Sequence, residues 1–342
     1  MTEASFQILR ADDGDERRRW QELHASWSER EVFAHPTYVS LFAGPNEHAM
    51  AAYSSSPEGW ILYPFIVRAI EPGLTDITTA YGYGGPFRSG APDAETFWEQ
   101  FATWAASQGI VSEFVRFSLF EDQLLSFPGE REQKLVNIVR TLDPDEESLW
   151  ESYDHKVRKN VNKARRSGVS IEVDLTGAHL DEFYRIYEGT MDRREARRGY
   201  YFPRSFFEAI SSGLAGQFAY FHATVEGRIV STELALVSAE NVYSFLGGTD
   251  QTAFDLRPND LLKHELIVWA KRAGKRRFVL GGGYTEDDGI VRYKKAFAPT
   301  GQMPFYVGRR VFDQAAYDRL TQQRGAMPAP GFFPAYRAPL PE

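Results

Sequence analysis

The 342-residue sequence contains no cysteine. Disulfide bonds, thiolate nucleophiles and zinc sites built on cysteine are therefore excluded. No apolar run approaches the roughly 20 residues that a membrane-spanning helix needs. The charged first 30 residues also lack the continuous apolar stretch of a signal peptide. These absences predict a cytoplasmic protein without a transmembrane segment.

Familiar catalytic signatures are also missing. There is no serine nucleophile elbow and no cluster of metal-ligating residues, and the seven histidines are scattered without a partner in sequence. The glycine-rich segment 81–87 is not a phosphate-binding loop, because no Lys-Ser or Lys-Thr pair follows it. The sequence therefore predicts a protein without a metal or cofactor and without a covalent enzyme intermediate.

The composition is that of a globular protein with an acidic balance. The net charge is -8, and 43% of the residues are hydrophobic. This length and apolar content suffice for a large core and favour two domains. The negative charge argues against duplex-DNA binding, but a local basic patch remains able to hold a phosphate group or an RNA end.

The two halves of the chain repeat one order of predicted elements. Each half runs strand, helices, antiparallel strands, helix and strand, as judged by hydrophobic periodicity. The turn-forming run Asp143-Pro144-Asp145 marks the boundary. We expect an α/β fold of two tandem domains with mixed, mostly antiparallel sheets. The first domain spans 1–143, joined by the C-terminal segment 311–342, and the second spans 144–310.

The most strongly patterned segment is a basic helix expected over residues 154–168. Four basic residues share one stripe of this helix, namely Lys156, Lys159, Lys163 and Arg166. Val157, Val161 and Ala164 form a second stripe that should face the core, with Arg158 near its edge. The basic stripe is either a solvated surface or an anion-binding face for a nucleotide diphosphate or a tRNA acceptor end.

Two further segments carry candidate binding residues. Arg193 and Arg194 belong to an arginine- and tyrosine-rich stretch, and guanidinium groups suit phosphate and carboxylate ligands. The alternative is an exposed helix end followed by packed aromatic residues. Tyr83 lies in the glycine-rich segment 81–87, where backbone N–H groups can approach a ligand. The alternative there is a turn packed by tyrosines.

Glu233 and Lys294 are the candidate catalytic residues. Glu233 interrupts the apolar strand expected over 229–237, and burial would raise its pKa and suit it to act as a general base. The alternative is an edge-strand carboxylate that reaches water or an arginine. Lys294 follows Tyr293 and precedes Phe297. Both aromatic residues are expected in the core, whereas Lys294 is either solvated or catalytic.

The order of these motifs resembles the Fem family of peptidoglycan aminoacyltransferases, a branch of the GNAT acyltransferase superfamily. The resemblance rests on the basic pattern of 156–164, the glycine-rich run 280–284 and the segment 289–297. It implies that the Tyr293–Lys294 pair lies at the catalytic cleft. It also implies that the basic helix, the arginine-rich stretch and the segment around Tyr83 contribute to substrate binding.

This resemblance implies transfer of an aminoacyl group from aminoacyl-tRNA to an amine of a cell-wall peptide precursor, either a small molecule or lipid-linked. One departure is the absence of a lysine in 33–38, which the family uses for precursor phosphate. The alternatives are an acyl-CoA-dependent N-acyltransferase acting on an amino sugar or other small amine, and a non-catalytic RNA-end or nucleotide-binding protein. Against CoA, the loop 255–262 lacks glycine and carries Pro258, which removes an N–H donor.

Overall fold

The computed structural model describes residues 5–283, 289–324 and 331–339. The chain forms two compact units. Unit 1 consists of Met1–Trp27, Phe33–Lys134 and Phe305–Glu342, and unit 2 consists of Ser28–Val32 and Leu135–Pro304. These units differ from the domains expected from the sequence in the assignment of residues 28–32, 135–143 and 305–310.

Unit 1 is built on a sheet with the strand order β1-β2-β3-β4-β6-β13, and β5 pairs with β3. Its strands are β1 (Gln7–Arg10), β2 (Glu47–Ser56), β3 (Gly59–Glu71), β4 (Leu74–Thr78), β5 (Phe87–Gly90), β6 (Ile110–Arg116) and β13 (Gln302–Val311), the last from Phe305 onward. Its helices are α1 (Gly14–Ser26), α2 (Pro36–Ser40), α3 (Ala94–Ser107) and α10 (Gln314–Gln323).

Unit 2 has the strand order β7-β12-β11-β10-β9-β8. Its strands are β7 (Glu130–Thr141, from Leu135 onward), β8 (Ser170–Asp174), β9 (Phe218–Val225), β10 (Arg228–Val237), β11 (Asn241–Thr249) and β12 (Arg277–Gly281). Its helices are α4 (Glu146–Glu151), α5 (His155–Arg166), α6 (Leu180–Arg193), α7 (Arg204–Gly213), α8 (Pro258–Arg272) and α9 (Gly289–Lys295).

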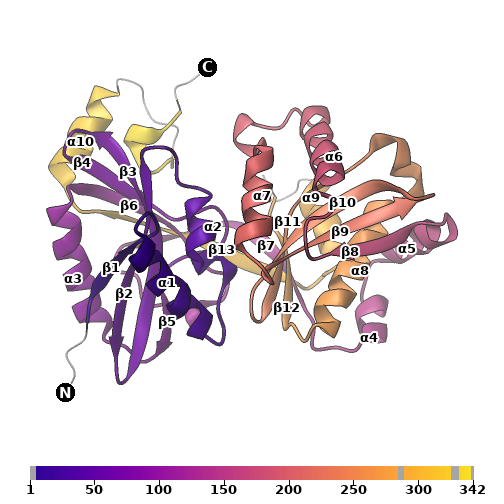
Figure 1. Cartoon of the computed structure of the whole chain (residues 1–342), viewed down its shortest axis with the longest axis horizontal. Helices are drawn as coiled ribbons and strands as arrows, with labels where there is room; N and C mark the ends of the chain where they lie inside the picture. Colours follow the sequence, from indigo (N-terminus) through magenta and orange to yellow (C-terminus); the bar gives the residue numbers. More distant parts are fainter. Residues whose placement is uncertain (1–4, 284–288, 325–330, 340–342) are drawn as a thin grey trace. The chain divides into compact units, whose positions relative to one another are not determined.

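The two sheets share one topology (Figure 1). In each unit, four strands pair antiparallel in succession, one parallel pair follows, and a last strand pairs antiparallel. The parallel pairs are β4 with β6 and β11 with β12. The closing strands, β13 and β7, come from distant parts of the chain. The prediction of two tandem α/β domains with mostly antiparallel sheets is therefore confirmed.

The basic helix forms as predicted because one stripe of it is apolar. Val157, Val161 and Ala164 are at most 2% exposed and pack in the core of unit 2 with residues of α8. Burial of such a stripe supplies most of the stability of a short amphipathic helix, since isolated helices of this length are marginal in water. The opposite surface of α5 is left free for charged residues.

Several elements differ from the expectation. The run Asp143-Pro144-Asp145 ends β7, but it also starts the unpredicted helix α4, because the Asp145 carboxylate accepts a hydrogen bond from Ser148 N at 2.7 Å. The alanine- and serine-rich β2 has little β-propensity and is held by pairing with β1 and β3. Strand β5 and helix α9 were also not predicted.

Among the described residues, no helix combines the length and the hydropathy that are needed to cross a membrane. Tyr284 and part of the proline-rich tail lie outside the described residues.

Candidate active site

Lys294 lies on α9, shortly after the glycine-rich end of β12. Its Nζ atom donates a hydrogen bond to the carbonyl oxygen of Gly282 at 2.6 Å. Gly281, the last residue of β12, has a φ of 84°, a conformation that favours glycine. The side chain of Lys294 is half-buried. The Lys294 side chain therefore reaches the end of the strand, as the sequence predicted.

Tyr293 of α9 is held by the first turn of α8. Its hydroxyl group accepts a hydrogen bond from Asn259 Nδ2 at 2.8 Å and donates one to the Asn259 carbonyl oxygen at 3.3 Å. Its ring packs against Phe297, with the ring centroids 5.3 Å apart. Burial, reinforced by the negative charges of Asp260 and Glu233, holds the pKa of Tyr293 well above its usual range.

Glu233 is buried and ion-paired. Its two carboxylate oxygens accept hydrogen bonds from Lys263 Nζ at 2.5 and 2.6 Å, and Ser244 Oγ donates to one of them at 2.6 Å. Both charged side chains are about 5% exposed. Strand β10 lies between β9 and β11, so the alternative of an edge-strand residue is wrong.

The sequence analysis missed Lys263, although a signal for it was present. Lys263 stands in the middle of the apolar part of α8, directly after Leu261 and Leu262 and shortly before Leu266. A lysine on the buried face of a helix requires a partner, because an unpaired buried charge is very costly. The only matching acid within an apolar strand of the second half is Glu233.

The basic stripe of α5 is exposed throughout. Within the described chain, its four members form no ion pair, namely Lys156, Lys159, Lys163 and Arg166. The neighbouring Arg165, by contrast, pairs with Glu265 at 2.9 Å. Arg158 is half-buried, and its buried Nε atom has no hydrogen-bond partner among the described residues. The stripe thus concentrates uncompensated positive charge on one helix of an acidic protein.

Asp260 connects the basic helix to the first turn of α8. Its Oδ1 atom accepts a hydrogen bond from Asn160 Nδ2 at 3.2 Å. Burial raises the pKa of Asp260, while the Asn160 hydrogen bond and the charges of Arg257 and Lys156 oppose the rise. Because Asp260 follows Asn259, the middle of α5, the beginning of α8 and Tyr293 form one connected region of unit 2.

The two candidate arginines of the arginine-rich stretch differ: Arg193 makes contacts within the protein, whereas Arg194 is exposed. Arg193 Nη1 donates to the Thr249 carbonyl oxygen at 3.2 Å, and its guanidinium group lies 5.0 Å from the centroid of the Phe254 ring. Arg194 follows the end of α6 and is exposed. Phe254 is 41% exposed, which is unusual for a ring of this size. Arg193 therefore serves partly to order the helix end.

Tyr83 lies in unit 1, in the loop between β4 and β5. Its ring packs edge-to-face against Phe33 at 5.4 Å and against Phe305 at 5.8 Å. Gly82 beside it has a φ of 107°, and a Cβ atom there would lie 2.4 Å from the Phe33 ring. The glycine is required by this close approach, so the packed-turn interpretation of the segment accounts for its composition.

Comparisons with known proteins agree with this geometry. Residues 151–295 match a GNAT acetyltransferase domain family. The chain is 25% identical over 198 residues to the UDP-N-acetylmuramoylpentapeptide-lysine N(6)-alanyltransferase of Weissella viridescens, covering 56% of this chain and 57% of that protein. The crystal structure of FemX superimposes with a TM-score of 0.69 and 12% identity, over 89% of this chain and 98% of FemX.

The chain therefore contains a GNAT-type domain over residues 151–295 and is similar to a Fem-type alanyltransferase in sequence and to FemX in fold. A more distant structural neighbour is L-PGS from Bacillus licheniformis, with a TM-score of 0.55 and 14% identity over 91% of this chain and 94% of L-PGS. At these identities, FemX and L-PGS establish the fold alone. The aligned part spans just over half of the curated alanyltransferase.

The matched GNAT domain contains most of the candidate site. Lys156, Glu233, Tyr293 and Lys294 all fall within residues 151–295, whereas Tyr83 falls outside them. In the described part of the chain, no group of three or more histidine or carboxylate side chains is arranged to hold a metal ion. The candidate residues that this domain brings together are a lysine, a tyrosine and a buried ion pair.

Proposed function

We propose that this Fem-like protein is an aminoacyltransferase that moves an aminoacyl group from aminoacyl-tRNA to an amine of a cell-wall peptide precursor. The observation that carries the proposal is the Tyr293–Lys294 pair at the glycine-rich end of β12, inside the matched GNAT domain. The relation to a UDP-N-acetylmuramoylpentapeptide-lysine alanyltransferase supports the acceptor class. The acceptor is either a small molecule or lipid-linked, and the reaction takes place in the cytoplasm.

The reaction is an attack of a neutral amine on an ester carbonyl. A C–N bond forms, the tetrahedral oxyanion collapses, and the ribose hydroxyl leaves as the amine proton is transferred to it or to water. The enzyme must align the two substrates and stabilise the oxyanion. The ammonium group of Lys294 supplies positive charge at the end of β12, and Asn259 positions the adjacent Tyr293.

Glu233 supports this site without touching substrate. Its acceptor positions are occupied by Lys263 and Ser244, which leaves little capacity to take a further proton from an amine. Its negative charge acts on the buried Tyr293 hydroxyl group. We therefore assign Glu233 to the positioning of the region and not to general-base catalysis.

The basic stripe of α5 is the proposed contact for the phosphates of the RNA donor. Lys156, Lys159, Lys163 and Arg166 are exposed, and Lys156 also lies close enough to lower the pKa of Asp260. Rows of exposed lysines and arginines supply sequence-independent affinity for nucleic acid. Arg158, Arg193 and Arg194 extend the positive surface of unit 2.

The start of α8 favours an RNA-linked donor over acyl-CoA. In GNAT enzymes that use CoA, backbone N–H groups at this helix terminus hold the pyrophosphate. Here Pro258 occupies the first turn and lacks an N–H group, Arg257 has a φ of 60°, and Asp260 is a buried acid. Each of these features reduces the fit to a pyrophosphate.

The test is turnover of Lys294→Met with alanyl-tRNA and lysine-containing precursor peptides. Removing one preorganised donor to an oxyanion typically costs about a hundredfold in kcat. Lys294→Met should lose about that much while keeping its melting temperature, and Lys295→Met is the matched control on the same helix. Full turnover by Lys294→Met, or an equal loss in both variants, would contradict the assignment.

Thermal-shift measurements separate the donor classes. We expect stabilisation by uncharged tRNA and by UDP-linked precursors, because binding to the folded state raises its stability by mass action. Stabilisation by CoA alone would instead identify an acyl-CoA-dependent N-acyltransferase. Binding of tRNA without formation of any transfer product would identify an RNA-binding protein.

A further inference from the structure

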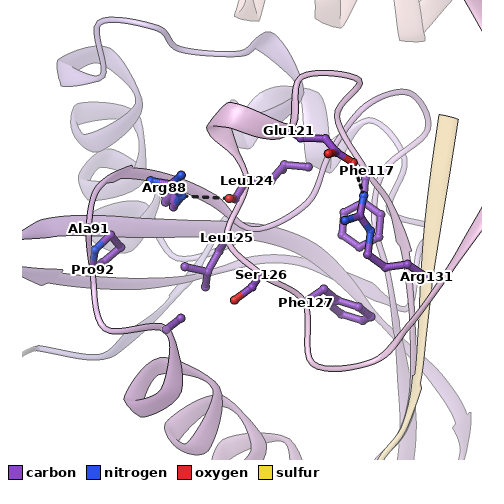
Figure 2. Close-up of a pocket in the computed structure, with 11 residues that line it drawn as sticks. Arg88, Ala91, Pro92, Phe117, Glu121, Leu124, Leu125, Ser126, Phe127 and Arg131 are labelled. Carbon is purple, nitrogen blue, oxygen red and sulfur yellow. Dashed lines mark hydrogen bonds and ion pairs between the residues drawn. The ribbon is translucent and has the colours of Figure 1, made fainter. Parts of the chain in front are cut away.

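Unit 1 contains a cavity of about 500 Å³ that shares no lining residue with the candidate active site. It lies between the residues that follow β5 and the loop from β6 to β7 (Figure 2). Its volume falls within the range of roughly 300–1,000 Å³ that is typical of small-molecule sites. The lining combines apolar side chains, chiefly Phe117, Leu124 and Phe127, with two arginines.

Arg131 forms one charged wall of this cavity. Its guanidinium group lies 5.2 Å from the ring centroid of Phe117 and 4.8 Å from that of Tyr306. Its Nη2 atom donates to Glu121 Oε1 at 2.6 Å. Contact with two rings and a carboxylate holds the guanidinium plane in one orientation, which lowers the entropic cost of binding an anion.

Arg88 forms a second charged wall, as Figure 2 shows on the other side of Leu124 and Leu125. Its Nε atom donates to the Leu124 carbonyl oxygen at 3.0 Å, and its Nη1 atom donates to the Gly90 carbonyl oxygen at 2.6 Å. A guanidinium group has more N–H donors than these two bonds use. Arg88 is thus fixed by the backbone and retains donors for a ligand.

The loop between the two arginines is itself anchored to the core of unit 1. Trp98 Nε1 donates to the Ser126 carbonyl oxygen at 2.8 Å, and Leu125 N donates to the Pro86 carbonyl oxygen at 2.8 Å. The Trp98 side chain is buried. The wall that this loop forms is therefore held in place by backbone hydrogen bonds to the core of unit 1.

The charges of the cavity do not cancel. Two guanidinium groups line it, and the carboxylate of Glu121 is the one acid among the lining residues. Glu121 is exposed and pairs only with Arg131 in the described chain, so Arg88 has no acidic partner there. We propose that this cavity binds a small organic anion, with a phosphate or carboxylate group at the arginines and an apolar body against Phe117, Leu124 and Phe127.

The test is titration calorimetry of the full chain with phenyl phosphate and with N-acetylphenylalanine, which present a phosphate ester and a carboxylate on the same kind of apolar body. Uncharged benzyl alcohol is the control ligand. Arg88→Met and Arg131→Met should each weaken anion binding about tenfold, the value of one charge-assisted hydrogen bond. Glu121→Gln should tighten it, because a competing carboxylate is removed from Arg131.

Two further variants keep the outcome clear. Ser126→Trp fills the cavity from an exposed position and should abolish binding, while its backbone bond to Trp98 remains. Arg319 lies on α10, away from the cavity, and pairs with Glu71. Arg319→Met removes the same charge and should leave the affinity for the anion unchanged. Lys294→Met should also bind normally, so a failure of the proposed aminoacyl transfer would leave this result unchanged.

The proposal is overturned if the wild type binds neither anion at millimolar concentration. It is also overturned if benzyl alcohol binds as tightly as phenyl phosphate, or if Arg88→Met and Arg131→Met bind as well as Arg319→Met. The stronger of the two anions identifies the ligand as a phosphate ester or a carboxylate.

Discussion

The two units share a sheet topology, but a buried carboxylate on a central strand has a different partner in each unit. In unit 2, Glu233 of β10 faces the ammonium group of Lys263 at 2.5 Å. In unit 1, Glu113 of β6 is fully buried and accepts a hydrogen bond from the Tyr63 hydroxyl group, while its Oε2 atom has no partner among the described residues. Burial raises the pKa of Glu113 to about 7, although the Tyr63 bond and the charge of Arg310 oppose the rise.

The comparison shows that the partner of a buried acid, and not its depth of burial, decides whether the acid forms an ion pair or remains a titratable group. Unit 1 itself supplies a second example, because Asp76 is completely buried but accepts bonds from Arg68 Nε at 2.8 Å and Arg337 Nε at 2.5 Å. Asp76 thereby ties the C-terminal segment to β4, whereas Glu113 remains a titratable group. When a cationic side chain pairs with a buried acid, the resulting ion pair links two elements of the fold.

The largest expected effect concerns the ion pair of unit 2. Lys263→Met leaves the Glu233 carboxylate buried without a cation, and breaking a buried pair in this way costs about 3–5 kcal/mol. The free energy of unfolding, measured by denaturant titration at pH 7.5, should fall by that amount. The double variant Lys263→Met/Glu233→Gln should recover part of the loss, since no buried charge remains. A loss below about 1 kcal/mol is the value of a solvent-exposed ion pair and would contradict the contrast drawn between Glu233 and Glu113.

A smaller effect, of opposite sign, is expected for the unpaired acid of unit 1. A folded-state pKa near 7, above the unfolded value of 4.5, means that folding favours the protonated Glu113. Its contribution to stability is fully present below about pH 4.5 and is lost as the pH rises through 7. Glu113→Gln should therefore be more stable than the wild type at pH 8, by up to roughly 3 kcal/mol, and should gain nothing at pH 4.5.

Glu31 is the matched control in unit 2. Burial raises its pKa to about 7 as well, but its carboxylate accepts bonds from Asn241 Nδ2 at 2.6 Å and the Tyr243 hydroxyl group at 2.8 Å. A glutamine at position 31 would place its NH₂ group, a donor, against a donor of Asn241 or Tyr243. Glu31→Gln should therefore gain less stability at pH 8 than Glu113→Gln does, as measured by the melting temperature across a series of pH values. An equal gain would mean that the hydrogen-bond partners do not distinguish the two acids.

The smallest effect on stability is expected on the surface of α5. Lys159→Glu/Lys163→Glu should change the free energy of unfolding by no more than about 0.5 kcal/mol, as is usual for exposed sites. It should nevertheless weaken tRNA binding, most strongly at low salt, and lower the slope of log affinity against log salt. The matched control in unit 1 is Arg18→Glu/Arg19→Glu on the exposed side of α1. An equal loss in both pairs would show that net charge alone is responsible.

Features set by nearby residues could be read from the sequence. The apolar and basic stripes of α5, the repeated element order and the return of Lys294 to the end of β12 follow from periodicity and glycine placement within short stretches. The sequence left open whether Glu233 is buried, because its apolar neighbours fit a central strand as well as an edge strand. The roles of Lys156, Arg158, Lys159, Arg193, Arg194 and Tyr83 in substrate binding stay predictions.

Features that join distant residues required the folded chain. Glu233 meets Lys263 from another element, Asn259 meets Tyr293 across α8 and α9, and the closing strands β7 and β13 join sheets away from their sequence neighbours. At the cavity of unit 1, likewise, Trp98 and Pro86 anchor the distant loop that carries Leu125 and Ser126. Short-range patterns specify which face of an element is apolar. Which polar groups meet inside depends on strand register and helix packing, which many distant contacts set together.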